Sequence, residues 1–285
     1  YGYNKRRLLT TETLDLDSNS FALSWRYNAR GDQEGLIYPS GLDISFLPNA
    51  YGEPQQASSF ASSVTRHPNG AINSLTYGNT LVQTTTQNLR QLPLRRTVGT
   101  LMDHTHLYDE NANIVTLTDG SAGNAESRNL AYDGLDRMIT ANAPAQLGNE
   151  SYSFDALDNL RRASIGSNTF VHTLDSQNRL SQIQKDGAAY VNYSQNAQGD
   201  TTLRSFVGIP SENIFANGFE NPARAPEFAS NQVLNFDRAH RLTSITGVES
   251  YQYDAHGRRV ITTRTSDGLK RYQLYSNAGV LMHTE

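Results

Sequence analysis

Short apolar segments alternate with short polar turns along the whole 285-residue chain. The segments LTSI (242–245) and YQLY (272–275) alternate apolar and polar side chains, which is typical of strands with one buried face. No segment keeps the 3.6-residue apolar spacing of an amphipathic helix. The pattern therefore predicts an all-β protein with little helix.

A seven-residue frame recurs through the chain, for example YDGLDRM (132–138) and YDAHGRR (253–259). It reads aromatic, Asp or Asn, two variable residues, a turn residue, often Arg or Asn, and an apolar residue. The average spacing of about 21 residues lies within the range of repeat proteins. We therefore expect a single array of about 14 units over residues 1–285, each with two short strands and two turns. The units begin at positions 3, 27, 48, 66, 87, 108, 132, 154, 174, 195, 214, 236, 253 and 275, those at 48, 66, 87, 174, 195 and 214 lacking an aromatic first residue.

The second and fifth positions of the frame predict its turn. An Asp or Asn side chain can accept hydrogen bonds from backbone N–H groups two residues later. The fifth residue is mostly Gly, Asp or Asn, which adopt a positive φ most easily. We interpret the Asp as a turn cap, the aromatic residue as part of the core, and the apolar seventh residue as the start of the return strand. The candidate turn residues are Tyr27, Asn28, Gly31, Tyr108, Asp109, Tyr132, Asp133, Phe154, Asp155, Asp175, Phe236, Asp237, Tyr253, Asp254 and Gly257.

Two further expectations follow from the frame. Arg residues that come directly after the fifth position, such as Arg137 and Arg258, are placed to pair with the Asp of their own turn. Exposed pairs of this kind contribute about 0–1 kcal/mol, so we expect them to set geometry at most. Fourteen units would give roughly 28 strands, and open sheets rarely exceed about 10 strands without curling. The array should therefore curl into a spiral sheet or part of a hollow shell.

The repeated Tyr-Asp unit resembles that of the rearrangement-hotspot (RHS) or YD-repeat family, and the resemblance covers essentially the whole chain. In that family the repeats wind into a hollow β-shell, and bacterial members enclose a C-terminal toxin domain. Relatives include the shells of insecticidal toxin complexes, wall-associated bacterial proteins and the teneurin adhesion proteins. The resemblance implies a structural shell segment that helps to deliver a toxin, secreted or at the bacterial cell surface. Its implied partners are a toxin cargo domain outside this chain, the remaining repeats, and secretion machinery or cell-surface glycans.

Parts of the family pattern are missing from the sequence. The chain has no core-closing motif and no Asp-Pro, and both of its ends fall inside the repeat pattern. We therefore expect an internal fragment of a larger protein. Residues 205–231 contain three prolines, which interrupt strand pairing, so this segment is predicted to be a loop or insertion that Phe215 and Phe219 could anchor.

Composition excludes several classes of protein. Hydrophobic residues make up 37% of the chain, below the roughly 45–50% of ordinary globular domains, which favours thin sheets with a wet face. The net charge is −4 and no basic block occurs, so nucleic acid is not an expected partner. No apolar run reaches the roughly 18–20 residues of a membrane span. The absence of cysteine excludes disulfides and thiolate metal sites.

Candidate chemistry is sparse. His104 and His106 share one face of a predicted strand near Asp103 and Asp109, but such a pair is more often solvated than metal-bound. Residues 15–19 begin like a calcium loop, which then fails to continue with the required Gly and Glu. No common catalytic or nucleotide-binding motif occurs. We therefore expect no enzyme activity, no cofactor and no metal.

Two other functions stay open at the level of sequence. A cell-surface adhesion or carbohydrate-binding module would use exposed Tyr rows and would require an aromatic groove on the outer face. A glycosidase would require two carboxylates that converge in a cleft at roughly 5–10 Å. A shell would instead be favoured by a polar inner lumen.

Overall fold

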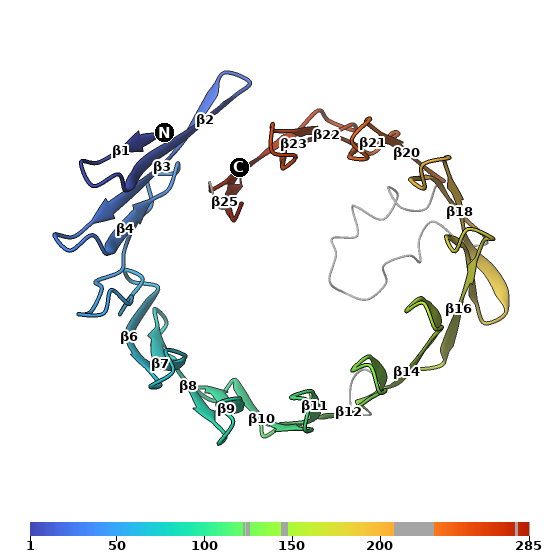
Figure 1. Ribbon diagram of the computed structural model, residues 1–285, viewed down its shortest axis with the longest axis horizontal. Coiled ribbons are helices and arrows are strands. Elements are labelled where there is room, and N and C mark those ends of the chain that lie inside the picture. The colour runs from blue at the N-terminus through green and yellow to red at the C-terminus, as the bar shows by residue number, and fades with distance from the viewer. Residues whose placement is uncertain (122, 124–125, 144–147, 208–230, 277–278, 285) are drawn as a thin grey trace. The chain divides into compact units, whose positions relative to one another are not determined.

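Every regular element of the computed structural model is a β-strand (Figure 1). The structure describes residues 1–121, 123, 126–143, 148–207, 231–276 and 279–284. These residues form 25 strands, close to the roughly 28 expected from the repeat. The predicted all-β class is confirmed, and no helix capable of crossing a membrane occurs in the described ranges.

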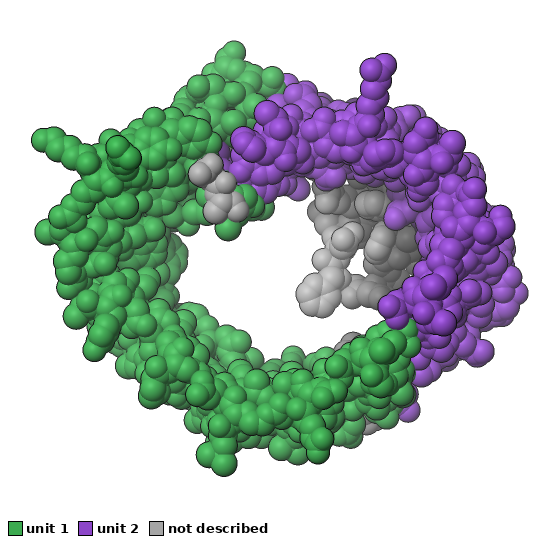
Figure 2. All heavy atoms as spheres, in the orientation of Figure 1, with its two compact units in different colours: residues 1–148, 276–283 green, residues 149–275, 284–285 purple. Residues whose placement is uncertain are grey.

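The chain divides into two compact units, shown in green and purple in Figure 2. The first comprises residues 1–148 and 276–283, and the second comprises residues 149–275 and 284–285. The short strand β25 (Leu281–Thr284) lies at the division. Each unit is described separately below.

The first unit opens with a five-stranded antiparallel sheet in which each strand pairs with the next. Phe21 and Leu23 alternate along β3, and Leu36 and Ile44 pair across β4 and β5, and all four side chains are buried. One face of this sheet therefore carries the apolar core, at about 1.5–3 kcal/mol for each fully buried side chain. The strands are β1 (Gly2–Tyr3), β2 (Leu9–Leu16), β3 (Asn19–Tyr27), β4 (Gln33–Ile37) and β5 (Asp43–Ser45).

The rest of the first unit is a run of antiparallel strands, again paired in sequence order. Its buried apolar side chains are small, such as Ala141 and Ala143 on the last strand. The strands are β6 (Ala61–Arg66), β7 (Ile72–Tyr77), β8 (Val82–Gln87), β9 (Pro93–Val98), β10 (Met102–Tyr108), β11 (Ile114–Asp119), β12 (Arg128–Tyr132) and β13 (Met138–Ala143).

The second unit continues the same arrangement from β14, whose first residue still belongs to the first unit. The strands are β14 (Gly148–Phe154), β15 (Leu160–Ile165), β16 (Asn168–Leu174), β17 (Leu180–Lys185), β18 (Ala188–Gln195), β19 (Thr201–Phe206), β20 (Gln232–Phe236), β21 (Leu242–Ile245), β22 (Glu249–Tyr253), β23 (Arg259–Arg264) and β24 (Lys270–Tyr275).

Strands β19 and β20 flank the predicted insertion at 205–231. They pair directly, Leu203 opposite Val233, and β19 extends to Phe206. Residues 208–230 lie outside the described residues, as do the unit start at 214, Phe215 and Phe219. In the ladder, the unit that begins at 195 is therefore followed directly by the unit that begins at 236.

The sheet of each unit is a single layer. Among the described residues, substantial contacts between elements join only strands that follow each other in sequence. Few side chains in the described part of the chain are fully buried. The aromatic first residues expected in the core, such as Tyr27, Tyr132 and Tyr253, are only half-buried.

The backbone at the fifth position of the frame is left-handed in every described repeat turn, including units without an aromatic first residue. This conformation gives the turn the tight reversal that a strand pair needs, and it favours glycine. The residues are Arg7, Gly31, Gly52, Gly70, Gln91, Ala112, Asp136, Asp158, Asn178, Gly199, His240, Gly257 and Gly279, with φ between 59° and 97°.

The opposite ends of the strand pairs carry shorter turns. Between β17 and β18, Lys185 pairs with Ala188, and the two intervening residues, Asp186 and Gly187, have φ of 51° and 83°. Positive φ at both central residues is the type I′ geometry that matches the twist of a hairpin. Residues Asp17 and Ser18, in the segment that resembles a calcium loop, form the same kind of turn between β2 and β3.

Gly257→Val should weaken its repeat turn by about 1–2 kcal/mol, since a β-branched residue resists the φ of 77° at this position. The cost would come from the backbone, because an added Cβ would meet only Arg241 Cδ, at 3.9 Å. Amide hydrogen exchange across residues 253–259 measures the effect. Gly134→Val is the control, because Gly134 has open space and no positive φ. Equal protection in both variants would contradict the assigned register.

Candidate functional site

The repeat turn, defined as the seven residues of the frame, is a polar feature that recurs throughout the described residues. Its backbone closes in the same way in each unit: in the unit at 132, the N–H of Asp133 donates to Arg137 O at 3.0 Å, and the N–H of Asp136 donates to Asp133 O at 3.1 Å. These two bonds reverse the chain within five residues.

The side chain at the second position caps this turn. Oδ1 of Asp254 accepts the backbone N–H groups of His256 and Arg258, both at 2.9 Å. The other candidate residues at this position make the same two contacts two and four residues ahead. They are Asn28, Asp109, Asp133, Asp155, Asp175 and Asp237.

The second oxygen or the amide nitrogen of the cap bonds to the side chain of the sixth residue. An Asp cap faces a donor: Arg137 contacts Asp133 Oδ2 through Nε at 2.7 Å, and Asn159 donates to Asp155 Oδ2 at 3.0 Å. An Asn cap faces an acceptor, as in three turns where its Nδ2 donates to a carboxylate. These pairs are Asn28–Asp32 at 3.0 Å, Asn49–Glu53 at 2.9 Å and Asn196–Asp200 at 2.9 Å.

These contacts stabilise the charged form of the capping carboxyl groups. The Asn159 side chain and backbone N–H groups lower the pKa of Asp155 to about 2. The Arg137 guanidinium lowers the pKa of Asp133 in the same way. The perturbed carboxyl groups are explained by turn geometry, so they do not indicate acid–base chemistry.

Pairing between successive units stops two residues short of each repeat turn. Strand β11 begins at Ile114, but its pairing with β12 begins at Thr116. Strand β21 begins at Leu242, and its pairing with β22 begins at Ser244. The strands therefore separate toward the repeat turns, and the backbone groups in each gap need other partners.

The tyrosine at the first position supplies that partner. Its hydroxyl donates to the carbonyl of the seventh residue of the preceding unit, 11 to 18 positions earlier. Burial raises the pKa of Tyr27, Tyr108 and Tyr132, as expected for half-buried phenols. The bonds are Tyr27 to Leu9 O at 2.9 Å, Tyr108 to Pro93 O at 2.6 Å, Tyr132 to Ile114 O at 3.0 Å and Tyr253 to Leu242 O at 2.7 Å.

Other first residues fill the gap differently. Gln195 takes the tyrosine's role with its amide, which donates to Leu180 O. Phe154 and Phe236 have no hydroxyl to donate. Beside Phe236, a cleft of about 410 Å³ lies between the turns of the units at 195 and 236. Its rim is bridged by His240, whose Nδ1 lies 2.9 and 3.0 Å from the two carboxylate oxygens of Asp200.

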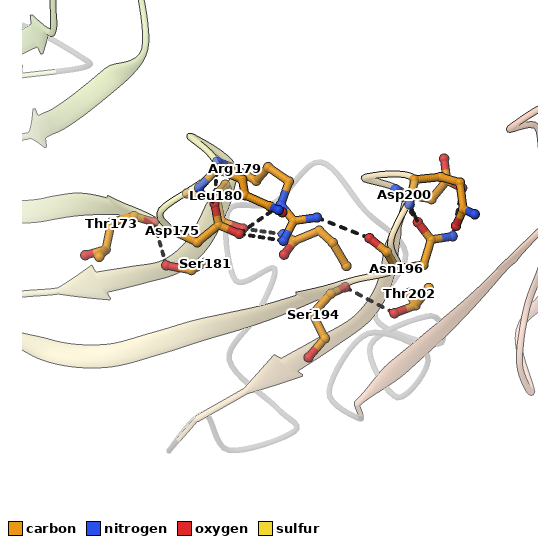
Figure 3. A network of polar contacts seen from close by, with 12 residues as sticks. Thr173, Asp175, Arg179, Leu180, Ser181, Ser194, Asn196, Asp200 and Thr202 are labelled. Carbon is orange, nitrogen blue, oxygen red and sulfur yellow. Dashed lines mark hydrogen bonds and ion pairs between the residues drawn. The ribbon is translucent and has the colours of Figure 1, made fainter.

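Arginine at the sixth position links its own turn to the next one. Arg179 pairs with Asp175 through Nε at 2.8 Å, and its Nη1 donates to Asn196 O at 3.1 Å (Figure 3). Arg241 also lies over the Tyr253 ring, 4.9 Å from its centre, and Arg258 over Tyr275 at 5.6 Å. Each such contact adds about 0.5–1 kcal/mol at an exposed site.

The residue directly after the frame, at the eighth position, adds another hydrogen bond in some units through its hydroxyl. Ser181 donates to Thr173 O at 3.0 Å and Thr202 donates to Ser194 O at 3.2 Å, both across the irregular pair next to the turn (Figure 3). The tyrosine hydroxyl and this second hydroxyl were not assigned from the sequence. The spacing between repeats could have suggested them, because the donors recur at fixed positions.

The two histidines on β10 have different surroundings. His104 Nε2 lies 3.1 Å from Glu126 Oε2, and Asp103 pairs with Arg95 at 2.7 Å. Burial, together with the nearby His104, lowers the pKa of His106, whose Nδ1 is buried without a hydrogen bond. In the part of the chain that the structure describes, no group of three or more His, Asp or Glu side chains is placed to hold a metal.

Tyr132→Phe removes one hydroxyl bond between units and leaves Ile114 O without it, so it should cost about 1–3 kcal/mol. Tyr193→Phe is the matched control, because the Tyr193 hydroxyl makes no hydrogen bond among the described residues. Amide hydrogen exchange on β11 and β12 in both variants measures the difference. A cost no larger than that of the control would show that the tyrosine acts by packing alone.

The pairing of the second and sixth residues predicts that a second substitution can restore the stability lost through a first one. Asn28→Asp alone should destabilise its turn by about 1 kcal/mol, because two carboxylates would face each other where Nδ2 now lies 3.0 Å from Asp32. Adding Asp32→Asn should restore stability, since it recreates the Asp–Asn pair found at Asp155. The single tryptophan, Trp25 on the adjoining strand, reports unfolding by fluorescence. If the double variant lost the sum of the stability lost in the two single variants, the pairing of the second and sixth residues would be contradicted.

Comparisons with known proteins agree with the repeat. Residues 236–270 match the RHS Repeat family model. A search of curated proteins finds no match.

Solved structures share the fold over nearly the full chain. The crystal structure of TcdB2-TccC3-TEV matches with a TM-score of 0.58 and 12% identity, over 100% of this chain and 15% of that one. TcdB2-TccC3 without its hypervariable C-terminal region matches with a TM-score of 0.56 and 15% identity, over 95% of this chain and 16% of that one.

The chain spans about 15% of the length of the solved chain that it matches over its full extent. The turn geometry at residues 236–242 and 253–259 falls within the family match. The resemblance inferred from the sequence is confirmed by the RHS Repeat match over residues 236–270, and the chain shares its all-β fold with the TcdB2-TccC3 structures.

Proposed function

We propose that this chain is a wall segment of an RHS-repeat shell that encloses a toxin domain and helps to deliver it. The toxin domain would belong to another part of the same protein, and the wall itself would have no catalytic role. In this proposal the protein is secreted or displayed at the surface of a bacterial cell.

The single-layer sheet is the observation that carries the proposal. An ordinary domain packs two layers around a core, whereas substantial element contacts here join only sequential strands in the described residues. A sheet of this kind buries few side chains, as the described residues show. It suits a partition between two spaces, and it agrees with the low hydrophobic fraction of 37%.

The polar groups of the repeat turns support a structural role. Their carboxylates, amides and guanidinium groups bond to their own turn or to the next one, as at Asp175 and Arg179. Catalysis would require some of these groups to be left for a substrate. The solved TcdB2-TccC3 protein is described as having a hypervariable C-terminal region, which is the arrangement expected of a common wall with variable cargo.

Labelling in the full natural protein tests enclosure, and this cysteine-free chain provides a clean background. One cysteine is placed in the proposed cargo domain, and the control cysteine replaces Leu157, which is 70% exposed at a repeat turn. A large polyethylene-glycol maleimide should label the Leu157→Cys control at once. It should label the cargo only after denaturation. Equal labelling of both sites in the native protein would contradict enclosure.

A further inference from the structure

A cleft of about 670 Å³ lies in the first unit between the repeat turns that begin at 48 and 66. Two features of the sequence open it. Arg66 stands at the first position of its turn, where other units have the tyrosine that bridges the gap. The turn at 49–53 is also not followed by a return strand, because the next strand, β6, begins at Ala61.

One wall of the cleft is held rigid by the turn. Asn49 Oδ1 accepts the N–H groups of Tyr51 at 2.8 Å and Glu53 at 3.1 Å, and Asn49 Nδ2 donates to Glu53 Oε2 at 2.9 Å. Arg30 of the preceding turn donates to Asn49 O at 2.6 Å. The backbone of Tyr51 and the carboxylate of Glu53 are therefore held before any ligand arrives, which lowers the entropic cost of binding.

Arg66 lines the opposite wall, where its guanidinium donor lies near the carboxylate acceptor of Glu53. Arg66 is anchored through Nη1, which donates to Gly70 O at 2.9 Å. Its Nε lies 3.8 Å from Glu53 Oε1, which is too long for a hydrogen bond. Both side chains are partly shielded, with 23% and 35% of their surface exposed. A hydroxyl group between them could accept from the guanidinium and donate to the carboxylate.

Tyr51 adds a flat apolar face at the mouth of the cleft. The residue is 89% exposed, although a large aromatic side chain is usually covered in a folded protein. The amide side chains of Asn49 and Gln55 also line the cleft. An aromatic face beside several groups that donate and accept hydrogen bonds is a combination that fits a ligand with one apolar face and many hydroxyls.

The chemistry of the cleft excludes two other ligand classes. Glu53 and Arg66 cancel each other's charge, so an anion gains little. An extended peptide would need a free strand edge, but the backbone beside the cleft is paired: Gln55 N–H donates to Phe46 O, and Val64 N–H donates to Gln55 O. We propose that this cleft binds a neutral oligosaccharide, stacked on Tyr51 and hydrogen-bonded to Glu53 and Arg66. The proposal does not depend on the enclosure of a cargo.

Isothermal titration of the chain with glucose, galactose and N-acetylglucosamine oligomers tests the proposal. At least one neutral oligomer should bind saturably. Tyr51→Ala and Glu53→Gln should each weaken that binding by about tenfold, the effect of losing one stacking contact or one charged hydrogen bond. Glutamine at position 53 can still accept from Asn49, so the turn should remain intact.

Two controls make the result specific. Leu89→Ala removes another fully exposed apolar side chain of a repeat turn and should leave binding unchanged. Tyr51→Phe keeps the ring and should retain most of the affinity. The proposal is overturned if no neutral oligomer binds, or if Tyr51→Ala and Glu53→Gln bind as tightly as the parent. Preferential binding of a sulfated oligosaccharide or an unfolded polypeptide at Tyr51 would also overturn it.

Discussion

Among the described residues, substantial contacts join neighbouring strands and not separate layers, and the rest of the structure depends on this constraint. A sheet in water normally gains stability by burying one face against another layer. Here the stabilising contacts run from strand to strand along the array, as in other repeat proteins. The repeat turn is therefore more than a connection. The capping Asp closes the turn, the sixth residue locks the cap, and the tyrosine hydroxyl joins each unit to the preceding one.

The local part of this design could be predicted from the sequence because its partners are close in the chain. The cap at Asp133 bonds within four residues, and the left-handed fifth position follows from its residue types. The tyrosine was harder to interpret, because its acceptor is Ile114, 18 residues earlier. Packing in the core was the natural expectation for an aromatic residue, but a single-layer sheet offers it only half-burial. The cleft at Tyr51 could not be foreseen, because it arises where a return strand is missing.

Function follows from how the polar groups are used. In most repeat turns the polar side chains bond to one another. This agrees with the proposed role as a wall segment and leaves few polar groups to bind a substrate. Residues 236–270 match the RHS Repeat model, and the chain shares its fold with TcdB2-TccC3. The turn at 49–53 differs because Glu53, Arg66 and Tyr51 retain groups that could meet a ligand. A wall and a surface site are compatible, since each uses different residues of the same repeat.

Stability through neighbouring units is the central claim, and a single repeat in isolation tests it most directly. Amide exchange of a peptide covering residues 253–274 can be compared with the same residues in the full chain. The N–H groups of His256 and Arg258, which bond to Asp254 in the structure, are the reporters. The account predicts that both exchange at unfolded rates in the peptide and are protected in the chain. A peptide that folds into a protected hairpin alone would contradict it.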